Sequence, residues 1–249
     1  MCVYNIGYLR TFLKFTVVPL VGVCLPLNMS SGRYEGQNQK DLVEHLVTRC
    51  NLKDKSVIET MLRVDRGKYA PSAFYNDHPV GIGYSATISA PHMHAWALEK
   101  LADQLKPGNR ALDVGCGSGY MATAMGDMVR GNGGVCVGID YIKELVDLST
   151  KNIMSDRPDL VNEGTVKLVV ADGWKGYENL APYDAIHVGA AATTTPKELL
   201  NQLKPGGRMV IPVGPDGNQM YLQYDKKSDG TIVETPLFGV RYVPLVKCS

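Results

Sequence analysis

The chain has 249 residues, of which 45% are hydrophobic and 20% are charged, and 26 Lys and Arg against 25 Asp and Glu give a formal net charge of +1. This length accommodates one large domain or two small ones. Balanced charge without a Lys- or Arg-rich run argues against a nucleic-acid partner, and the hydrophobic fraction excludes a disordered or low-complexity chain.

The first 28 residues differ from the rest of the chain. Their only charges are Arg10 and Lys14, and the hydrophobic run from Val17 to Leu27 is shorter than the ~20 residues of a membrane helix. Basic residues before a hydrophobic run also occur in secretory signals, but no clear cleavage site follows, and Met29 offers a compact start. We therefore expect a leader at 1–28 outside a single domain at 29–249. The expected location is cytoplasmic, with a secretory route as the alternative if 1–28 acts as a signal.

The cysteines are spread along the chain with no Cys-x-x-Cys pair and no histidine at metal-site spacing. They are Cys2, Cys24, Cys50, Cys116, Cys136 and Cys248. This pattern predicts reduced thiols of a cytosolic protein and not a disulfide framework.

Helical spacing of hydrophobic residues appears first near 42–47 and 57–62, and predicts two short amphipathic helices. Residues 70–89 are rich in Gly, Pro, Tyr, Asn and Ser and predict a long loop, which in a compact domain is usually functional. Residues 90–105 return to helical spacing and predict a third helix.

Strand and helix patterns then alternate. Buried strands are predicted at 111–114, 135–139, 166–170, 183–189 and 207–213, with helices after residue 119, at 141–153 and at 196–203. Repeated βα units need crossover connections, so the expected fold is α/β, with a doubly wound, mostly parallel sheet. Residues 220–224 and 240–246 predict an antiparallel C-terminal edge hairpin around the turn Ser228-Asp229-Gly230.

A glycine-rich turn follows the first strand of this sheet. Gly115, Gly117 and Gly119 leave the backbone open to a ligand at the carboxyl ends of the strands, where open α/β sheets bind ligands. The G-x-G-x-G spacing with Tyr120 departs from the dinucleotide fingerprint, and no Lys-Ser/Thr follows as in a P-loop.

Acidic residues stand near the same strand ends. Asp140 closes the second strand, where a carboxylate can accept hydrogen bonds from both ribose hydroxyls of an adenosine. Asp113 precedes the turn, near any cationic or amine group of the ligand, and Asp172-Gly173 closes the third strand. The ordered set favours a ligand site over the tight turns of a generic α/β protein.

Leu112 to Gly119 resembles the first motif of the Rossmann-like class I S-adenosyl-L-methionine-dependent methyltransferases. Residues 86–95, Ala-Thr-Ile-Ser-Ala-Pro-His-Met-His-Ala, resemble the signature of protein-L-isoaspartate (D-aspartate) O-methyltransferases, and 183–191, 203–208 and 211–214 are similar to the same family. The match extends over about residues 37–246.

The resemblance implies methyl transfer from S-adenosyl-L-methionine to the free α-carboxylate of L-isoaspartyl and D-aspartyl residues in damaged proteins and peptides. The product is S-adenosyl-L-homocysteine, and the ester collapses to a succinimide that can reopen to aspartate. Because a carboxylate is already ionised at neutral pH, no general base is required.

The resemblance also implies the site residues. Ser89 matches the family's active-site serine, and its hydroxyl can donate to one carboxylate oxygen while the other attacks; the alternative role is an N-cap for a helix beginning near Pro91. The expected cofactor-binding residues are Ala86, Thr87, Ile88, Ser89, His94, Asp113, Gly115, Gly117, Ser118, Gly119, Asp140, Asp172 and Gly173. We expect no metal, because His92 and His94 have no third ligand at suitable spacing.

Two further residues have open interpretations. Cys116 is interpreted as a small packing residue, with an alkylatable thiol as the alternative. Trp174 either stacks on an adenine or caps the sheet.

The C-terminus departs from the family pattern. After Tyr242-Val243-Pro244-Leu245 the family usually has a Thr and, a few residues on, a Gln that reach back to the cofactor site, whereas Val246 stands in the first place here and the sequence ends at Ser249. Two alternatives therefore stay open: a methyltransferase of the same fold acting on a small carboxylate, and a cofactor-binding protein without turnover. The expected partners are isoaspartyl-containing proteins and peptides, with no membrane and no nucleic acid, for a monomeric enzyme.

Overall fold

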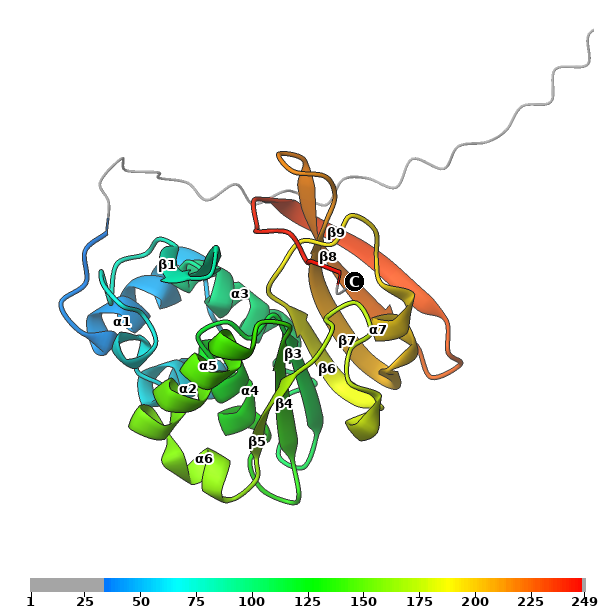
Figure 1. The fold of residues 1–249 in the computed structure, drawn as a ribbon, viewed down its shortest axis with the longest axis horizontal. Helices are drawn as coiled ribbons and strands as arrows, with labels where there is room; N and C mark the ends of the chain where they lie inside the picture. The colour runs from blue at the N-terminus through cyan, green and yellow to red at the C-terminus, as the bar shows by residue number, and fades with distance from the viewer. Residues whose placement is uncertain (1–33, 248–249) are drawn as a thin grey trace, which may run out of the picture. The chain divides into compact units, whose positions relative to one another are not determined.

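The computed structural model describes residues 34–247, so the predicted leader at 1–28 lies outside the described residues (Figure 1). The described residues belong to one compact unit. None of its described helices is long and apolar enough to cross a membrane.

A seven-stranded sheet forms the centre of this unit, in the order β5-β4-β3-β6-β7-β8-β9. Its parallel strands are β3 (Arg110–Val114), β4 (Val135–Asp140), β5 (Val166–Val170), β6 (Tyr183–Val188) and β7 (Leu203–Val213). Strands β8 (Gln219–Lys226) and β9 (Ile232–Val240) extend it antiparallel. The chain runs outward from β3 to β5 and then returns to β6 beside β3, which makes the β3–β6 boundary the switch point where α/β sheets bind ligands.

Helices cover both faces of the sheet (Figure 1). They are α1 (Gln39–Cys50), α2 (Lys55–Arg63), α3 (Pro91–Leu101), α4 (Tyr120–Val129), α5 (Lys143–Asp156), α6 (Pro158–Asn162) and α7 (Lys197–Asn201), with short 3₁₀ turns at Arg66–Lys68 and Glu178–Leu180. The predicted fold class is confirmed.

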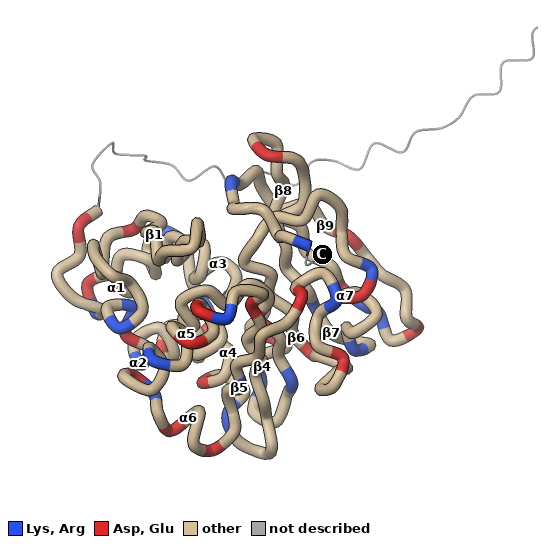
Figure 2. Tube along the Cα trace, in the orientation of Figure 1, with Lys and Arg blue, Asp and Glu red and all other residues tan. Residues whose placement is uncertain are grey.

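Alternation along the strands divides the interior into two cores. Ala111 and Cys136 face one core with helices α1 to α4, whereas Leu112 and Val137 face the other with α7. Small residues on the first face allow close helix packing: a Cβ on Gly138 would lie 3.0 Å from Ala122 Cβ. Acidic and basic residues alternate along the trace without a large region of one sign (Figure 2).

Two predicted elements need correction. Residues 70–89 are not a continuous loop, because they contain an antiparallel hairpin of β1 (Val80–Gly83) and β2 (Ala86–Ile88). Its strands are too short to show alternation. The second strand of the edge hairpin is β9 and not 240–246. The residues Glu234-Thr235-Pro236 within β9 are not typical of a strand. An edge strand nevertheless tolerates charge and proline, because one side of its backbone is unpaired.

Candidate active site

The glycine turn lies at the β3–β6 switch point. Gly115, Gly117 and Gly119 have φ angles of 76°, 51° and 87°, in the left-handed region that favours glycine. A Cβ on Gly117 would also lie 3.3 Å from Ile82 Cδ1 of the hairpin. The backbone of this turn therefore lies open to a neighbouring cavity only because these positions lack side chains.

Asp140 borders that cavity, which has a volume of about 150 Å³. Its Oδ2 accepts a hydrogen bond from Gly117 N (3.2 Å) and its Oδ1 one from Ile142 N (3.1 Å). Burial raises the pKa of Asp140, and these backbone hydrogen bonds oppose the rise. The carboxylate is thus held in place by the turn itself. The predicted residues that line this cavity are Ala86, Thr87, Gly115, Gly117, Asp140 and Gly173.

A smaller inner cavity of about 30 Å³ adjoins the first and shares Thr87, Gly115 and Gly117 with it. It brings together five further predicted residues: Ile88, Ser89, His94, Asp113 and Ser118.

Two polar atoms of the inner cavity are buried without a partner in the described chain. Asp113 Oδ1 is hydrogen-bonded to His187 Nδ1 at 2.7 Å, but Asp113 Oδ2 has no partner, and neither has His94 Nδ1. Asp113 is 1% exposed and His94 5%. Burial, followed by the nearby Arg66 guanidinium, lowers the pKa of His94 well below its ordinary value, so the ring is neutral at pH 7. Buried polar atoms are rarely left unpaired, and two of them together favour a polar ligand here.

Two predicted residues do not line the cavities. Gly119 is the N-cap of α4, and the Asp172 carboxylate accepts the Trp174 backbone N–H at 2.9 Å. Both shape the surrounding turns.

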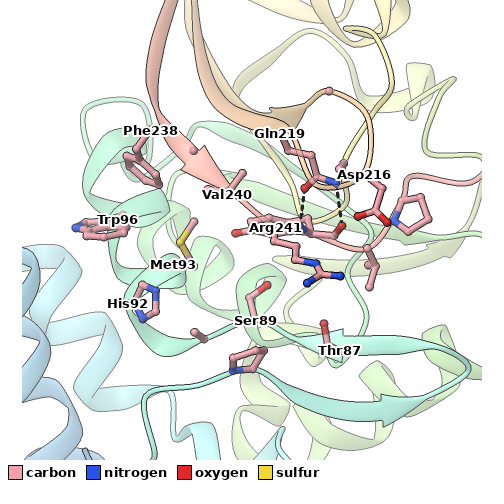
Figure 3. Close-up of a pocket in the computed structure, with 18 of the residues that line it drawn as sticks. Thr87, Ser89, His92, Met93, Trp96, Asp216, Gln219, Phe238, Val240 and Arg241 are labelled. Carbon is pink, nitrogen blue, oxygen red and sulfur yellow. Dashed lines mark hydrogen bonds between the residues drawn. The ribbon is translucent and has the colours of Figure 1, made fainter. Parts of the chain in front are cut away.

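A large cleft of about 790 Å³ opens on the other side of Ser89 (Figure 3). Ser89 lines both this cleft and the inner cavity, and Thr87 lines all three spaces. The alternative role of Ser89 as an N-cap is wrong, because Ala90 is the N-cap of α3 and no side chain caps that helix. The hydroxyl is therefore not engaged in capping and stands between cleft and cavity.

Sequence reasoning missed most of the cleft wall. Trp96 of α3 and Phe238 of β9 face each other with ring centroids 4.8 Å apart, and Arg241 follows β9 (Figure 3). Met93 had a detectable signal, because it lies in the signature segment, and Trp96 follows three residues later on the same face of α3. Phe238 did not, since the second edge strand was predicted in the wrong place.

Gln219 fixes this wall through two hydrogen bonds to the backbone of Tyr242. Its Nε2 donates to Tyr242 O at 3.1 Å, and its Oε1 accepts from Tyr242 N at 2.6 Å (Figure 3). Burial raises the pKa of Tyr242, with the Ser89 side chain opposing the rise. The two bonds place the backbone on either side of Tyr242 at the boundary of cleft and cavity.

The C-terminal segment covers the first cavity. Residues 243–246 line it, and Leu245 N donates to Ala191 O at 2.8 Å. Trp174 Nε1 donates to Leu245 O at 2.9 Å, and Trp174 lines none of the three spaces. Trp174 therefore anchors this segment against the second core. Val246 lies at the cavity rim, 40% exposed.

Cys116 packs within the glycine turn. It is buried, with Sγ 3.6 Å from Ser149 Oγ, and burial raises its pKa well above the ordinary thiol value. The packing interpretation is confirmed. Among residues 34–247 no group of three or more His, Cys, Asp or Glu side chains is arranged to hold a metal ion.

Comparisons with known proteins agree with this geometry. The family model described as "Protein-L-isoaspartate(D-aspartate) O-methyltransferase (PCMT)" matches residues 37–249. Protein-L-isoaspartate O-methyltransferase 2 of Arabidopsis thaliana is 50% identical over 210 residues, covering 83% of this chain and 67% of that one. The wheat (Triticum aestivum) protein-L-isoaspartate O-methyltransferase is 49% identical over 220 residues, covering 86% and 95%. A crystal structure from Plasmodium falciparum is described as a protein-L-isoaspartate O-methyltransferase in complex with S-adenosyl-L-homocysteine. It matches with a TM-score of 0.80 and 39% sequence identity, and the match covers 86% of this chain and 100% of that one.

Proposed function

The chain belongs to the protein-L-isoaspartate (D-aspartate) O-methyltransferase family, and we propose how its own residues carry out that family's reaction. The reaction transfers a methyl group from S-adenosyl-L-methionine to the free α-carboxylate of L-isoaspartyl and D-aspartyl residues in damaged proteins. The resulting ester collapses to a succinimide, which can reopen to aspartate.

The residues of the two smaller cavities fit S-adenosyl-L-methionine. When bound, this cofactor supplies a methyl group on a positively charged sulfur. Asp140 accepts hydrogen bonds from ribose hydroxyls, and the turn at Gly115 and Gly117 lets the ligand approach the backbone. The unpartnered Asp113 Oδ2 accepts a hydrogen bond from an ammonium group or another donor, and the unpartnered His94 Nδ1 accepts or donates one according to the tautomer of its ring.

The large cleft receives the damaged polypeptide. Its volume of about 790 Å³ and its apolar wall of Trp96, Met93 and Phe238 favour a peptide segment over a small free carboxylate. Ser89 donates a hydrogen bond to one oxygen of the reacting carboxylate and leaves the other oxygen to attack. Because that carboxylate is already ionised, these residues act by alignment and exclusion of water, which can contribute about 7–11 kcal/mol when the geometry is good.

The observation that carries this assignment is the position of Ser89. The cleft and the inner cavity meet at this residue, so a group held in one lies next to a group held in the other. An in-line transfer between a bound peptide and a bound cofactor requires such a junction.

A labelling experiment tests the function and the role of Ser89 together. The chain is incubated with methyl-labelled S-adenosyl-L-methionine and an isoaspartyl peptide, beside its normal aspartyl twin. We expect a base-labile ester on the isoaspartyl peptide alone. Ser89→Ala should lower turnover much more than cofactor affinity measured by calorimetry, whereas the exposed turn variant Ser228→Ala should behave as the parent chain. Full activity of Ser89→Ala contradicts the assigned role, and an unlabelled peptide contradicts the function.

Its oligomeric state and location are part of the same proposal. A monomer in the cytoplasm, without nucleic-acid or membrane partners, agrees with the balanced charge of +1 and with Cys50, Cys116 and Cys136 standing outside disulfides. Sedimentation of the purified chain tests the monomer, and fractionation of cells expressing the full chain tests the location.

A further inference from the structure

The sequence contains four pairs in which Asn or Asp precedes Gly: Asn132-Gly133, Asp172-Gly173, Asp216-Gly217 and Asp229-Gly230. Such pairs are the sites at which a polypeptide most easily becomes isoaspartyl, because glycine has no Cβ to hinder the approach of its own backbone nitrogen. The chain therefore carries sequences of the kind that generate its substrate.

The damage is a simple cyclisation. The backbone nitrogen of the glycine attacks the side-chain carbonyl carbon of the preceding residue, a C–N bond forms, and ammonia leaves from Asn or water from Asp. Water then opens the succinimide at its main-chain carbonyl, which leaves the α-carboxylate free and the chain running through the side chain. Asn reacts more readily than an ionised Asp, because its amide is a better electrophile than a carboxylate.

The structure separates the four pairs by their hydrogen bonds. The Asp172 carboxylate accepts Trp174 N at 2.9 Å, and the Asp229 carboxylate accepts Thr231 N at 2.9 Å. A Cβ on Gly173 would lie 2.8 Å from Leu245 Cδ1, so that pair is also tightly packed. Asp216-Gly217 is exposed, but its ionised carboxylate is the poorer electrophile. These three pairs are protected or slow.

Asn132-Gly133 has neither protection. Both residues are exposed, and within residues 34–247 no hydrogen bond involves the Asn132 side chain or the Gly133 N–H. Their φ angles of 51° and 78°, with Gly134 N donating to Gly131 O at 2.9 Å, form a tight turn of the type that selects Asn-Gly. The geometry of the turn explains why Asn-Gly occurs here. Of the four pairs, Asn132-Gly133 is therefore the one that we expect to form a succinimide fastest.

The position of Asn132 excludes self-repair within one molecule. It lies between α4 and β4, at the amino end of β4, whereas Asp140 ends β4 and Ser89 lines the inner cavity together with Gly115, which follows β3. The six residues of β4 alone separate these ends by roughly 20 Å, at about 3.3 Å per residue. A damaged Asn132 thus cannot reach the cleft of its own chain.

We propose that Asn132-Gly133 is a site of spontaneous isoaspartyl formation, and that a second copy of this chain methylates the damaged residue in trans. The inference rests on the proposed function. An isoaspartyl residue lengthens the main chain by one carbon and so disrupts the turn, which is closed by the hydrogen bond from Gly134 N to Gly131 O. Restoring aspartate at 132 therefore restores the turn.

The test uses the full chain aged at neutral pH and 37 °C, then incubated with labelled S-adenosyl-L-methionine and digested briefly with trypsin at about pH 6, because the ester is lost at alkaline pH. We expect a base-labile methyl ester on the peptide 131–143, which lies between Arg130 and Lys143, and its amount should grow with ageing time. At low concentration the initial rate should rise with the square of the protein concentration. Asn132→Gln should remove this label, whereas Asn179→Gln, an exposed control not followed by glycine, should retain it.

An added isoaspartyl peptide separates the two ideas. If the peptide is labelled but peptide 131–143 is not, the inference is wrong and the proposed function stands. If the peptide is not labelled either, both are wrong. A rate that rises only linearly with protein concentration would overturn transfer between two copies.

Discussion

Gln219→Leu offers a direct test of how the cleft is built. The substitution keeps the approximate volume but removes both hydrogen bonds to the Tyr242 backbone, at 3.1 and 2.6 Å. A hydrogen bond of this kind contributes about 0.5–1.5 kcal/mol net, so the pair contributes about 1–3 kcal/mol. Water from the adjoining cleft can reach the freed N–H and C=O, which keeps the loss from growing larger.

This loss of unfolding free energy can be measured as a fall in the melting temperature, Tm. For a domain of this size 1 kcal/mol corresponds to about 2–4 °C, so we expect Tm to fall by about 2–12 °C in calorimetry. The KM for an isoaspartyl peptide should rise, because Tyr242 and Arg241 lose their fixed positions in the cleft wall. Gln223→Leu on the same strand is the matched control: it removes one side-chain bond to Asp225 and should leave KM unchanged. An unchanged Tm and KM for Gln219→Leu would refute the reasoning.

Two further predictions concern charge. Burial favours the neutral form of Asp127, but hydrogen bonds from Arg63 and Arg157 outweigh it and hold the pKa below the ordinary value, so this stabilisation is present above about pH 4 and is lost as pH falls through the lowered pKa. Asp127→Asn should therefore reduce the unfolding free energy by about 1–3 kcal/mol at pH 7 in urea titrations, and a gap of the same size at pH 2 would contradict this. Arg241 is the only Lys or Arg that lines the cleft within the described chain. An exposed charge pair contributes about 0.2–1 kcal/mol, and Arg241→Glu removes one such pair with a Glu-flanked peptide and creates one with a Lys-flanked peptide. The substitution should therefore shift the preference in kcat/KM from Glu-flanked to Lys-flanked isoaspartyl peptides by about 2- to 30-fold. Asp216→Lys should shift it the opposite way, and equal effects on both peptides would exclude a role in charge selection.

The sequence by itself determined the sheet and the cofactor side of the site. Four of the five hydrophobic runs are buried on both faces, and the fifth, which forms β5 at the sheet edge, is an unbroken run of β-branched and apolar residues around Lys167. Such runs stand out without knowledge of their neighbours, and all five appear as β3 to β7. The glycine turn, Asp113 and Asp140 follow directly from those strands, because a residue at a strand end needs only the strand to be placed.

Only the tertiary structure decided the substrate side. The cleft joins α3 to the segment after β9, nearly 150 residues later in the chain, and no local pattern records that contact. β9 escaped prediction because an edge strand needs no hydrophobic alternation, and Trp174 proved to be an anchor because its partner, Leu245, lies 71 residues away. Periodicity reports how a segment is buried, whereas a cleft depends on which distant segments meet, and that is decided by packing.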